Sequence, residues 1–191
     1  MAGRRRPGRP HRDRRRARGR GLAGPGRAGA PHAGRHPMTD SLALDYGTAA
    51  QVLAAQPFAE LVGTQLTAFG DGAATLVVPI RPELRQQFGY VHGGVLSYLA
   101  DNALTFAAGT VLGANVLTGG FSITYLRPAA GERLRAEARV TGSTRRQAVV
   151  NCEIYAESEP AAADGLETHG AAPVLCAVAQ GTTRAVDRAL G

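Results

Sequence analysis

The sequence of 191 residues contains no lysine and no tryptophan, and it has only two cysteines. All 22 basic residues are therefore arginines, a bias that fits a GC-rich coding sequence better than selection for function. Cys152 and Cys176 lie in apolar runs typical of strands, as buried thiols do, and no metal-ligand spacing surrounds them. We therefore expect two isolated buried thiols and no metal site.

Long apolar runs are also missing. No run of about 18 apolar residues occurs, so we expect no membrane-spanning segment. A secretory signal needs an apolar core of about 7–15 residues, which residues 22–25 (Leu-Ala-Gly-Pro) do not supply. These absences predict a cytoplasmic protein without membrane contact.

Excess positive charge is confined to the start of the chain. Residues 1–37 hold twelve arginines and one acid, a net charge of +11, whereas residues 38–191 hold ten arginines and fourteen acids, a net charge of −4. The first segment is rich in Arg, Gly, Pro and Ala and cannot bury enough surface to offset its ordering entropy, so we expect a disordered tail. It either binds an anionic surface such as nucleic acid, or precedes a true start at Met38. The abrupt change of composition at Met38 favours the second alternative, so we expect one domain over 38–191 and no nucleic-acid partner.

Acidic residues are nearly absent from the middle of the chain, where Asp101 is the only one between Glu83 and Glu132. It lies within residues 88–113 (FGYVHGGVLSYLADNALTFAAGTVLG), an apolar stretch rich in small residues that predicts a long helix. Such a helix is too apolar on all sides for the surface, and an isolated buried carboxylate is costly unless it has a role. We therefore interpret Asp101 as a functional acid rather than an exposed helix carboxylate.

The start of this helix carries a second candidate feature, the sequence His92-Gly93-Gly94. Consecutive glycines before a helical run leave unpaired N–H groups at the positive end of the helix dipole, where a carbonyl oxygen that becomes negative can be stabilised. Gly93 and Asp101 are eight residues apart, about 12 Å along a helix. The two groups of one helix therefore cannot act on the same atom. If they act together, they come from two subunits, which predicts an active site at a dimer interface.

The remaining pattern predicts a short helix, two strands, the long helix and four more strands. We expect a helix over 48–56 with Val52 and Leu53 facing inward, and strands over 63–69, 73–80, 115–128, 133–143, 145–157 and 174–186. The sequence Gly70-Asp71-Gly72 predicts a turn between the first two strands, and Gly119-Gly120 predicts a bulge or a close backbone approach. A long apolar helix followed by an antiparallel meander indicates an α+β fold whose sheet wraps around that helix.

Other polar and aromatic side chains are weaker candidates. Gln86 and Gln87 could donate amide hydrogen bonds to a carbonyl, although a solvated loop suits Gln87 better, and Thr118 could orient a water or simply pack. Three arginines at strand ends could meet phosphate groups, although such residues are usually solvated: Arg127, Arg145 and Arg146. Four side chains could line a pocket for an aromatic or a medium alkyl group: Tyr98, Leu104, Phe106 and Phe121.

Three segments together resemble a known family. His92-Gly93-Gly94, then Leu99-Ala100-Asp101, then residues 122–128 (SITYLRP) are similar to the hotdog-fold thioesterases, in particular to the phenylacetic-acid-degradation (PaaI-like) branch. The resemblance covers residues 57–187 and is strongest over residues 86–128.

The resemblance implies a hotdog fold and an acyl-CoA thioester hydrolase. The helix start around Gly93 would polarise the thioester carbonyl, Asp101 from the other subunit would act as nucleophile or as general base on water, and His92 would assist. Many members of this branch have asparagine six residues before the histidine, where this chain has Gln86, longer by one methylene. In some relatives a serine on the following strand helps to place the water, and Thr118 or the adjacent glycines lie at that point.

The candidate site residues follow from these considerations. The catalytic candidates are Asp101, His92, Gly93 and Gln86, and the substrate-binding candidates are Gly94, Tyr98, Thr118, Gly119, Arg127, Arg145 and Arg146. The resemblance implies no metal and no cofactor, since CoA belongs to the substrate, and it implies a homodimer or a dimer of dimers.

Two other functions stay open. A hotdog hydratase or dehydratase would need an Asp-His pair placed for proton transfer at the acyl β-carbon, whereas His92 and Asp101 are separated along the helix. A non-catalytic acyl-CoA sensor would fit a DNA-binding N-terminal segment, but the arginine-rich tail has no helix-turn-helix pattern. The presence of Asp101 also argues against a pure sensor.

Overall fold

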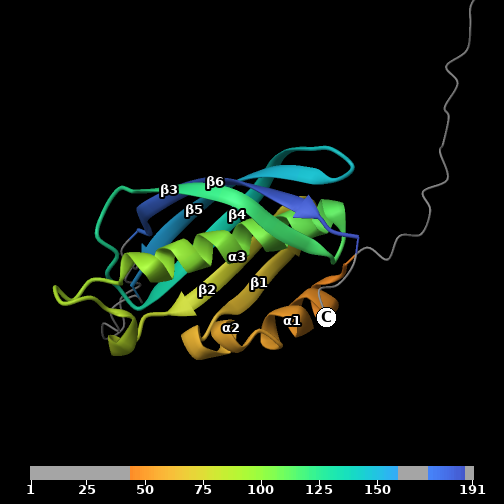
Figure 1. Cartoon of the computed structure of the whole chain (residues 1–191). Coiled ribbons are helices and arrows are strands. Elements are labelled where there is room, and N and C mark those ends of the chain that lie inside the picture. Colours follow the sequence, from red (N-terminus) through yellow and green to blue (C-terminus); the bar gives the residue numbers. More distant parts are fainter. Residues whose placement is uncertain (1–43, 159–171, 188–191) are drawn as a thin grey trace, which may run out of the picture. The chain divides into compact units, whose positions relative to one another are not determined.

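A computed structural model describes residues 44–158 and 172–187 of the chain. Six strands form one antiparallel sheet in the order β1-β2-β4-β5-β6-β3, and this sheet curves around the long helix α3, Gly93–Leu112 (Figure 1). The structure thus has the predicted α+β arrangement of an antiparallel sheet wrapped around a central helix. The predicted tail over 1–37, the start of the domain at Met38 and most of the loop before β6 lie outside the described residues.

The strands lie close to the ranges predicted from hydrophobic alternation. β1 spans Gln65–Gly70, β2 Ala73–Pro79, β3 Val116–Tyr125, β4 Arg133–Ser143, β5 Gln147–Glu157 and β6 Val174–Ala185. In β4, for example, Leu134, Ala136 and Ala138 are buried, while the side chains between them point outward. Because successive strand side chains alternate between faces, the apolar half of β2, β4 and β5 faces α3 and the other half faces outward, whereas β3 contains no buried residue.

The turn predicted at Gly70-Asp71-Gly72 and the bulge predicted at Gly119-Gly120 are both present. β1 and β2 are joined through Asp71 and Gly72, which have φ angles of 49° and 74°. In β3 the register with β6 shifts between Thr118 and Gly120, which confirms the predicted bulge. β3 is also an edge strand of the sheet, with β6 as its only neighbour among the described strands.

The region before β1 contains one helix more than predicted. α1 spans Tyr46–Ala54, close to the expected range, and α2 spans Pro57–Val62. Pro57 therefore begins a second helix, because its fixed φ and missing N–H carry no penalty in the first turn. The expected inward position of Val52 is wrong, since this side chain is 44% exposed while Leu53 is buried. The buried face of α1 is narrow and consists of Ala49 and Leu53, one helical turn apart.

The central helix supplies the middle of the hydrophobic core. Leu104 and Phe106 are 0% and 6% exposed and pack within this core, so the expectation that they line an acyl pocket is wrong. Phe106 meets Phe69 of β1 edge to face, with ring centroids 6.4 Å apart. Leu104 and Phe106 both lie on sides of α3 that the curved sheet covers. The sequence pattern alone does not show which sides of the helix are covered.

By length and composition alone α3 could also cross a membrane, with a mean hydropathy of 1.3. Half of that apolar window is buried inside the fold, and the core helix of a soluble protein passes the same test. The absence of membrane contact therefore stays a prediction.

Two short connections complete the described chain between β2 and α3: the 3₁₀ helix η1, Pro82–Leu84, and a tight loop closed by a bridge between Arg85 and Val91.

Candidate active site

Asp101 lies in the middle of α3 and is partly buried on the side of the helix that faces β3. The hydroxyl of Thr118 in β3 donates a hydrogen bond of 2.6 Å to its Oδ1. Thr105, one turn further along α3, lies 2.9 Å from the Thr118 hydroxyl and donates to the backbone oxygen of Asp101 at 3.0 Å. The carboxylate is therefore held from a second element of the fold.

The two threonine hydroxyls form a short chain that ends at this carboxylate. An ionised carboxylate can only accept hydrogen bonds, so Thr118 donates its single proton to Asp101. The one hydroxyl proton of Thr105 is then shared between the backbone oxygen of Asp101 and the oxygen of Thr118. The sequence suggested that Thr118 orients water or packs, and the structure brings it into direct contact with Asp101. Thr105 was not among the sequence candidates, although its place four residues after Asp101 is the spacing of neighbours on one helix face.

His92 and the two glycines form the start of α3. His92 is the N-cap residue, and its Nδ1 accepts a hydrogen bond of 2.9 Å from the N–H of Gly94. The Nδ1 atom that accepts this bond carries no proton. The backbone N–H of His92 donates to Leu84 at 2.8 Å, which anchors the turn to the preceding connection. The exposed imidazole of His92 therefore caps its own helix.

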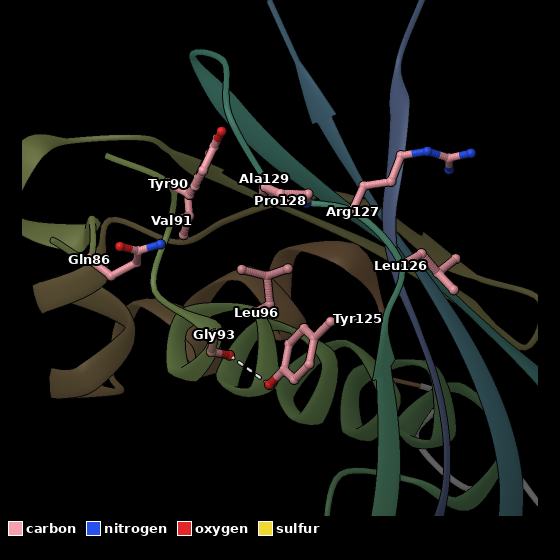
Figure 2. A pocket seen from close by; sticks show the side chains of 10 residues that line it. All are labelled: Gln86, Tyr90, Val91, Gly93, Leu96, Tyr125, Leu126, Arg127, Pro128 and Ala129. Atoms are coloured by element: carbon pink, nitrogen blue, oxygen red, sulfur yellow. Dashed lines mark hydrogen bonds between the residues drawn. The ribbon is translucent and has the colours of Figure 1, made fainter. Parts of the chain in front are cut away.

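Gly93 is the first residue of α3 and lies at a pocket of about 360 Å³ (Figure 2). Within residues 44–158 and 172–187, no group accepts a hydrogen bond from the N–H of Gly93. Gln86, Tyr90, Leu96 and Tyr125 also line this pocket. An N–H at a helix start that opens onto a pocket is an available donor for an oxygen that becomes negative.

Gln86 lies on the opposite wall of this pocket (Figure 2). Its Oε1 accepts a hydrogen bond from the backbone N–H of Phe88. Because this bond occupies the carbonyl end of the amide, the NH₂ end is left to donate toward the pocket. Gln86 and Gly93 thus line the same pocket, and the carbonyl-orienting role of Gln86 stays a prediction.

Several other candidates lie away from this pocket. His92 and Gly94 line a second pocket of about 340 Å³ beside Phe58. The ring of Tyr98 packs edge to face on Phe58 at 4.8 Å, and its hydroxyl lies 2.9 Å from Thr64 Oγ1. Tyr98 therefore joins α3 to the region around α2 and does not line the Gly93 pocket.

The candidate arginines are divided between two regions. Arg127 lines the Gly93 pocket and donates to the backbone oxygen of Leu175 at 3.1 Å. Arg145 and Arg146 lie in the turn between β4 and β5, where Arg146 pairs with Asp187 at 2.7 Å. Neither of them lines the Gly93 pocket of the same chain. Gly119 lies in the β3 bulge, where a Cβ would approach Thr182 Oγ1 to 3.0 Å.

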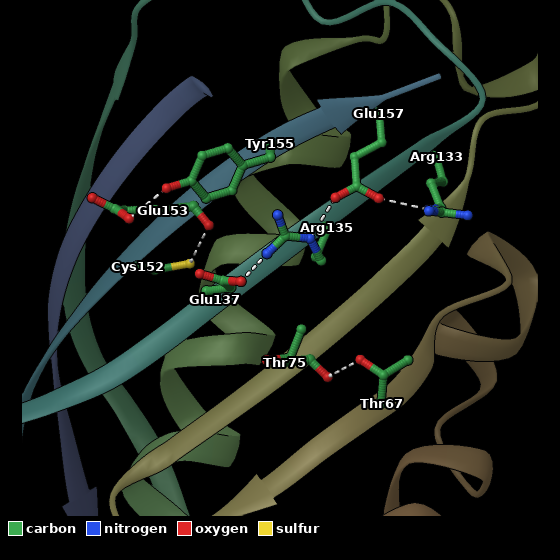
Figure 3. Close-up of polar contacts among 9 residues, drawn as sticks. All are labelled: Thr67, Thr75, Arg133, Arg135, Glu137, Cys152, Glu153, Tyr155 and Glu157. Atoms are coloured by element: carbon green, nitrogen blue, oxygen red, sulfur yellow. Dashed lines mark hydrogen bonds and ion pairs between the residues drawn. The ribbon is translucent and has the colours of Figure 1, made fainter. Parts of the chain in front are cut away.

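A separate group of charged residues covers the outer face of the sheet, away from α3 (Figure 3). Arg135 pairs with Glu157 at 2.5 Å and with Glu137, and its guanidinium lies 4.8 Å from the ring centroid of Tyr155. Arg133 pairs with the other oxygen of Glu157 at 2.7 Å. Arg133, Arg135 and Glu157 border a hollow of about 610 Å³, but their charges are paired with one another, so this face is a poor candidate for catalysis.

In the part of the chain that the structure describes, no three His, Cys, Asp or Glu side chains gather in a way that could hold a metal ion. The expectation of a reaction without metal or cofactor stays a prediction.

Residues 88–163 match the family model described as the Thioesterase superfamily. A thioesterase family protein from Silicibacter pomeroyi is 28% identical, with 74% of this chain and 98% of that chain covered and a TM-score of 0.64. A mutant of the phenylacetic acid degradation protein PaaI from Thermus thermophilus is 25% identical, with 69% and 100% covered and a TM-score of 0.56. The E. coli PaaI protein from the phenylacetic acid degradation operon, 20% identical over 74% of this chain and 92% of that chain, shares the fold with a TM-score of 0.61. No curated protein matches the chain.

The fold is therefore the hotdog fold of the thioesterases. The resemblance to the PaaI-like branch that the sequence indicated is confirmed, and thioester hydrolysis is supported in general terms.

Proposed function

We propose that this protein hydrolyses acyl-CoA thioesters to a free acid and CoA. One observation carries the proposal. The central helix presents a carboxylate held by a neighbouring strand at Asp101, and an N–H without an acceptor in the described chain at Gly93. The match to the Thioesterase superfamily supports the same reaction class.

The two groups suffice chemically for this reaction. The carbonyl oxygen of the thioester accepts a hydrogen bond from Gly93, which stabilises the negative charge that develops during attack. In the general-base form, Asp101 takes a proton from water while the water oxygen bonds to the carbonyl carbon. The carbon–sulfur bond then breaks, and the proton passes to the CoA thiolate, a good leaving group. In the nucleophilic form, the Asp101 carboxylate bonds to the carbonyl carbon, the carbon–sulfur bond breaks and CoA leaves as the thiolate. Water then hydrolyses the resulting mixed anhydride, which releases the free acid and regenerates Asp101, and the proton that this step frees passes to the thiolate.

The active site is proposed to lie between two subunits. Gly93 and Asp101 are separated by two turns of one helix, about 12 Å, so a second copy of the chain must supply one of them. The edge strand β3 supports this arrangement, because an edge strand presents unpaired N–H and C=O groups to a neighbour. Pairing through β3 also places Thr118, which holds Asp101, at the interface. We propose a homodimer or a dimer of dimers in the cytoplasm.

Binding of CoA is proposed to use the arginines near the ends of the strands. Arg127 at the Gly93 pocket is the nearest candidate for a phosphate group, and Arg145 and Arg146 would contribute from the turn between β4 and β5. No metal or other cofactor is proposed.

Hydrolysis of an acyl-CoA panel tests the proposal, with phenylacetyl, benzoyl and short, medium and long alkyl chains, and with release of free thiol as the readout. We expect the wild type to hydrolyse at least one thioester and Asp101→Asn to lose about a hundredfold or more in kcat. Asp71→Asn is the matched control, because this exposed turn residue has a φ of 49°, which asparagine also tolerates. Full activity of Asp101→Asn would contradict the assignment, and binding without turnover by the wild type would favour the sensor.

A further inference from the structure

One tyrosine ties the first turn of α3 to the end of β3. The hydroxyl of Tyr125 donates a hydrogen bond of 3.0 Å to the backbone oxygen of Gly93 (Figure 2). Its ring lies so close that a Cβ at Gly93 would be 3.4 Å from the ring Cζ, and Ser97 Oγ is 3.3 Å from the same hydroxyl. Tyr125 therefore contacts the residue that the proposed function makes the oxyanion donor.

The peptide group between Gly93 and Gly94 is held at both ends. Its oxygen accepts from Tyr125, and its N–H donates to His92 Nδ1 at 2.9 Å. The preceding peptide group is held through the oxygen of His92, which accepts from the N–H of Val95 at 2.9 Å. Since a trans peptide is planar, the N–H of Gly93 points opposite to the carbonyl of His92, away from the helix.

Holding both peptide groups matters because Gly93 and Gly94 have no side chains to limit their backbone. Glycine reaches more backbone conformations than any other residue, so a helix that starts with two glycines frays more readily. A hydrogen-bond donor accelerates a reaction most when it is already aimed at the developing charge. The N–H of Gly93 belongs to the preceding peptide group, which meets the Gly93–Gly94 peptide group at the Cα of Gly93. Because Tyr125 and His92 restrain the Gly93–Gly94 peptide group, rotation at this Cα is limited, and with it the directions that the N–H of Gly93 can take.

We propose that Tyr125 is a positioning residue that holds the N–H of Gly93 in the direction of the thioester oxygen. This inference rests on the proposed function and adds to it a residue from another element of the fold. It also assigns a positioning role to His92, since its Nδ1 accepts from the N–H of Gly94 and so holds the other end of the Gly93–Gly94 peptide group.

The kinetic test is Tyr125→Phe, which keeps the ring on Gly93 and removes only the hydroxyl. We expect kcat for the preferred acyl-CoA to fall about fivefold to tenfold, with KM unchanged within about twofold, because the loss concerns the transition state. Tyr155→Phe is the matched control, since it removes a tyrosine hydroxyl that bonds Glu153 on the outer face of the sheet. We expect its kcat and KM to equal those of the wild type.

A spectroscopic test separates positioning from a general loss of structure. Benzoyl-CoA with a ¹³C-labelled thioester carbonyl is bound to Asp101→Asn, with and without Tyr125→Phe, and its carbonyl band is recorded by infrared difference spectroscopy. A well-aimed donor lowers this frequency, so we expect a smaller downward shift in the double variant.

Each result identifies what has failed. Unchanged kcat and an unchanged band after loss of the Tyr125 hydroxyl would overturn the inference and leave the proposed function standing. Hydrolysis of no thioester by the wild type would overturn both.

Discussion

The hydroxyl of Thr118 lies 2.6 Å from Oδ1 of Asp101 and joins the edge strand β3 to the middle of the central helix. The two residues are 17 positions apart in the chain, and the β3 bulge begins at Thr118. The orientation of the carboxylate therefore depends on how β3 packs against α3. Any change that shifts β3, including its pairing with a second subunit, would therefore change the orientation of the Asp101 carboxylate.

Loss of the Thr118 hydroxyl should lower activity. Thr118→Val has nearly the same shape, and we expect kcat for acyl-CoA hydrolysis to fall about tenfold, because a hydrogen bond to a charged group is lost. Thr118→Ser should keep most of the activity. Thr67→Val is the control, since its exposed hydroxyl bonds only the backbone oxygen of Thr75 on the outer face (Figure 3). Equal kcat for Thr118→Val and the wild type would show that this bond plays no part in hydrolysis.

Removal of a single N–H tests the proposed oxyanion donor. Gly93 is the first residue of α3, a position that accepts proline, and His92 before it is extended with a ψ of 135°, within the range that residues before proline prefer. Gly93→Pro therefore removes the N–H with little disturbance of the helix. We expect kcat to fall about a hundredfold with an unchanged far-ultraviolet circular dichroism spectrum.

The same variant also decides whether the active site is shared between subunits. Asp101→Asn and Gly93→Pro are each expected to keep about a hundredth of the activity or less, but a mixed dimer of the two would hold one intact shared site. After co-refolding in equal amounts, we expect about a quarter of the wild-type activity, since half of the dimers are mixed and each has one of two sites. If both groups acted within one subunit, mixing would restore nothing.

The ion pairs of Glu157 on the outer face of the sheet should make the free energy of unfolding depend on pH. Burial alone would raise the pKa of Glu157, which is 11% exposed, but hydrogen bonds and charge from Arg135 and Arg133 outweigh it and lower this pKa. A carboxyl group with a lowered folded-state pKa stabilises the fold above its ordinary pKa of about 4.3. That contribution is lost as the pH falls through the folded-state value.

Melting temperatures between about pH 3 and pH 6 measure this contribution. We expect the wild type to lose stability on acidification more steeply than Glu157→Gln, which lacks the titrating group. Glu60→Gln, a change at an exposed residue of α2, should follow the wild type. Parallel curves for the wild type and Glu157→Gln would contradict the expected role of this ion pair.

The two cysteines should be unreactive in the folded protein. Burial, with the charge of Glu153, raises the pKa of Cys152 to about 12, and burial also raises the pKa of Cys176. The thiolate is the reactive form, so we expect almost no reaction with an aromatic disulfide reagent at about pH 8 and two reactive thiols per chain in denaturant. Rapid reaction of the native protein would show that Cys152 or Cys176 becomes exposed to solvent in the folded state. Unreactive cysteines would also leave a thiol-release assay for CoA free of background.

Local patterns in the sequence predicted most of the elements. The alternation in β4, the turn at Asp71 and the bulge at Gly120 each depend on a few neighbouring residues, and all three are present. The errors concern residues whose surroundings come from distant parts of the chain. Val52 faces solvent, and Phe106 packs against Phe69 of β1, because the curvature of the sheet decides which sides of the helices are covered.

The candidate site likewise has some features that the sequence predicted and others that only the tertiary structure shows. The sequence alone determined that Asp101 is the only acid in the middle of the chain and that a helix begins at two glycines, because residue identity and local helix geometry suffice for both. Only the tertiary structure decided that Thr118 holds Asp101 and that Tyr125 holds Gly93. Both contacts join β3 to α3, and the register of β3 in the curved sheet selects which of its side chains reach the helix. That register results from pairing with β6, more than fifty residues further along the chain, and no local pattern encodes it.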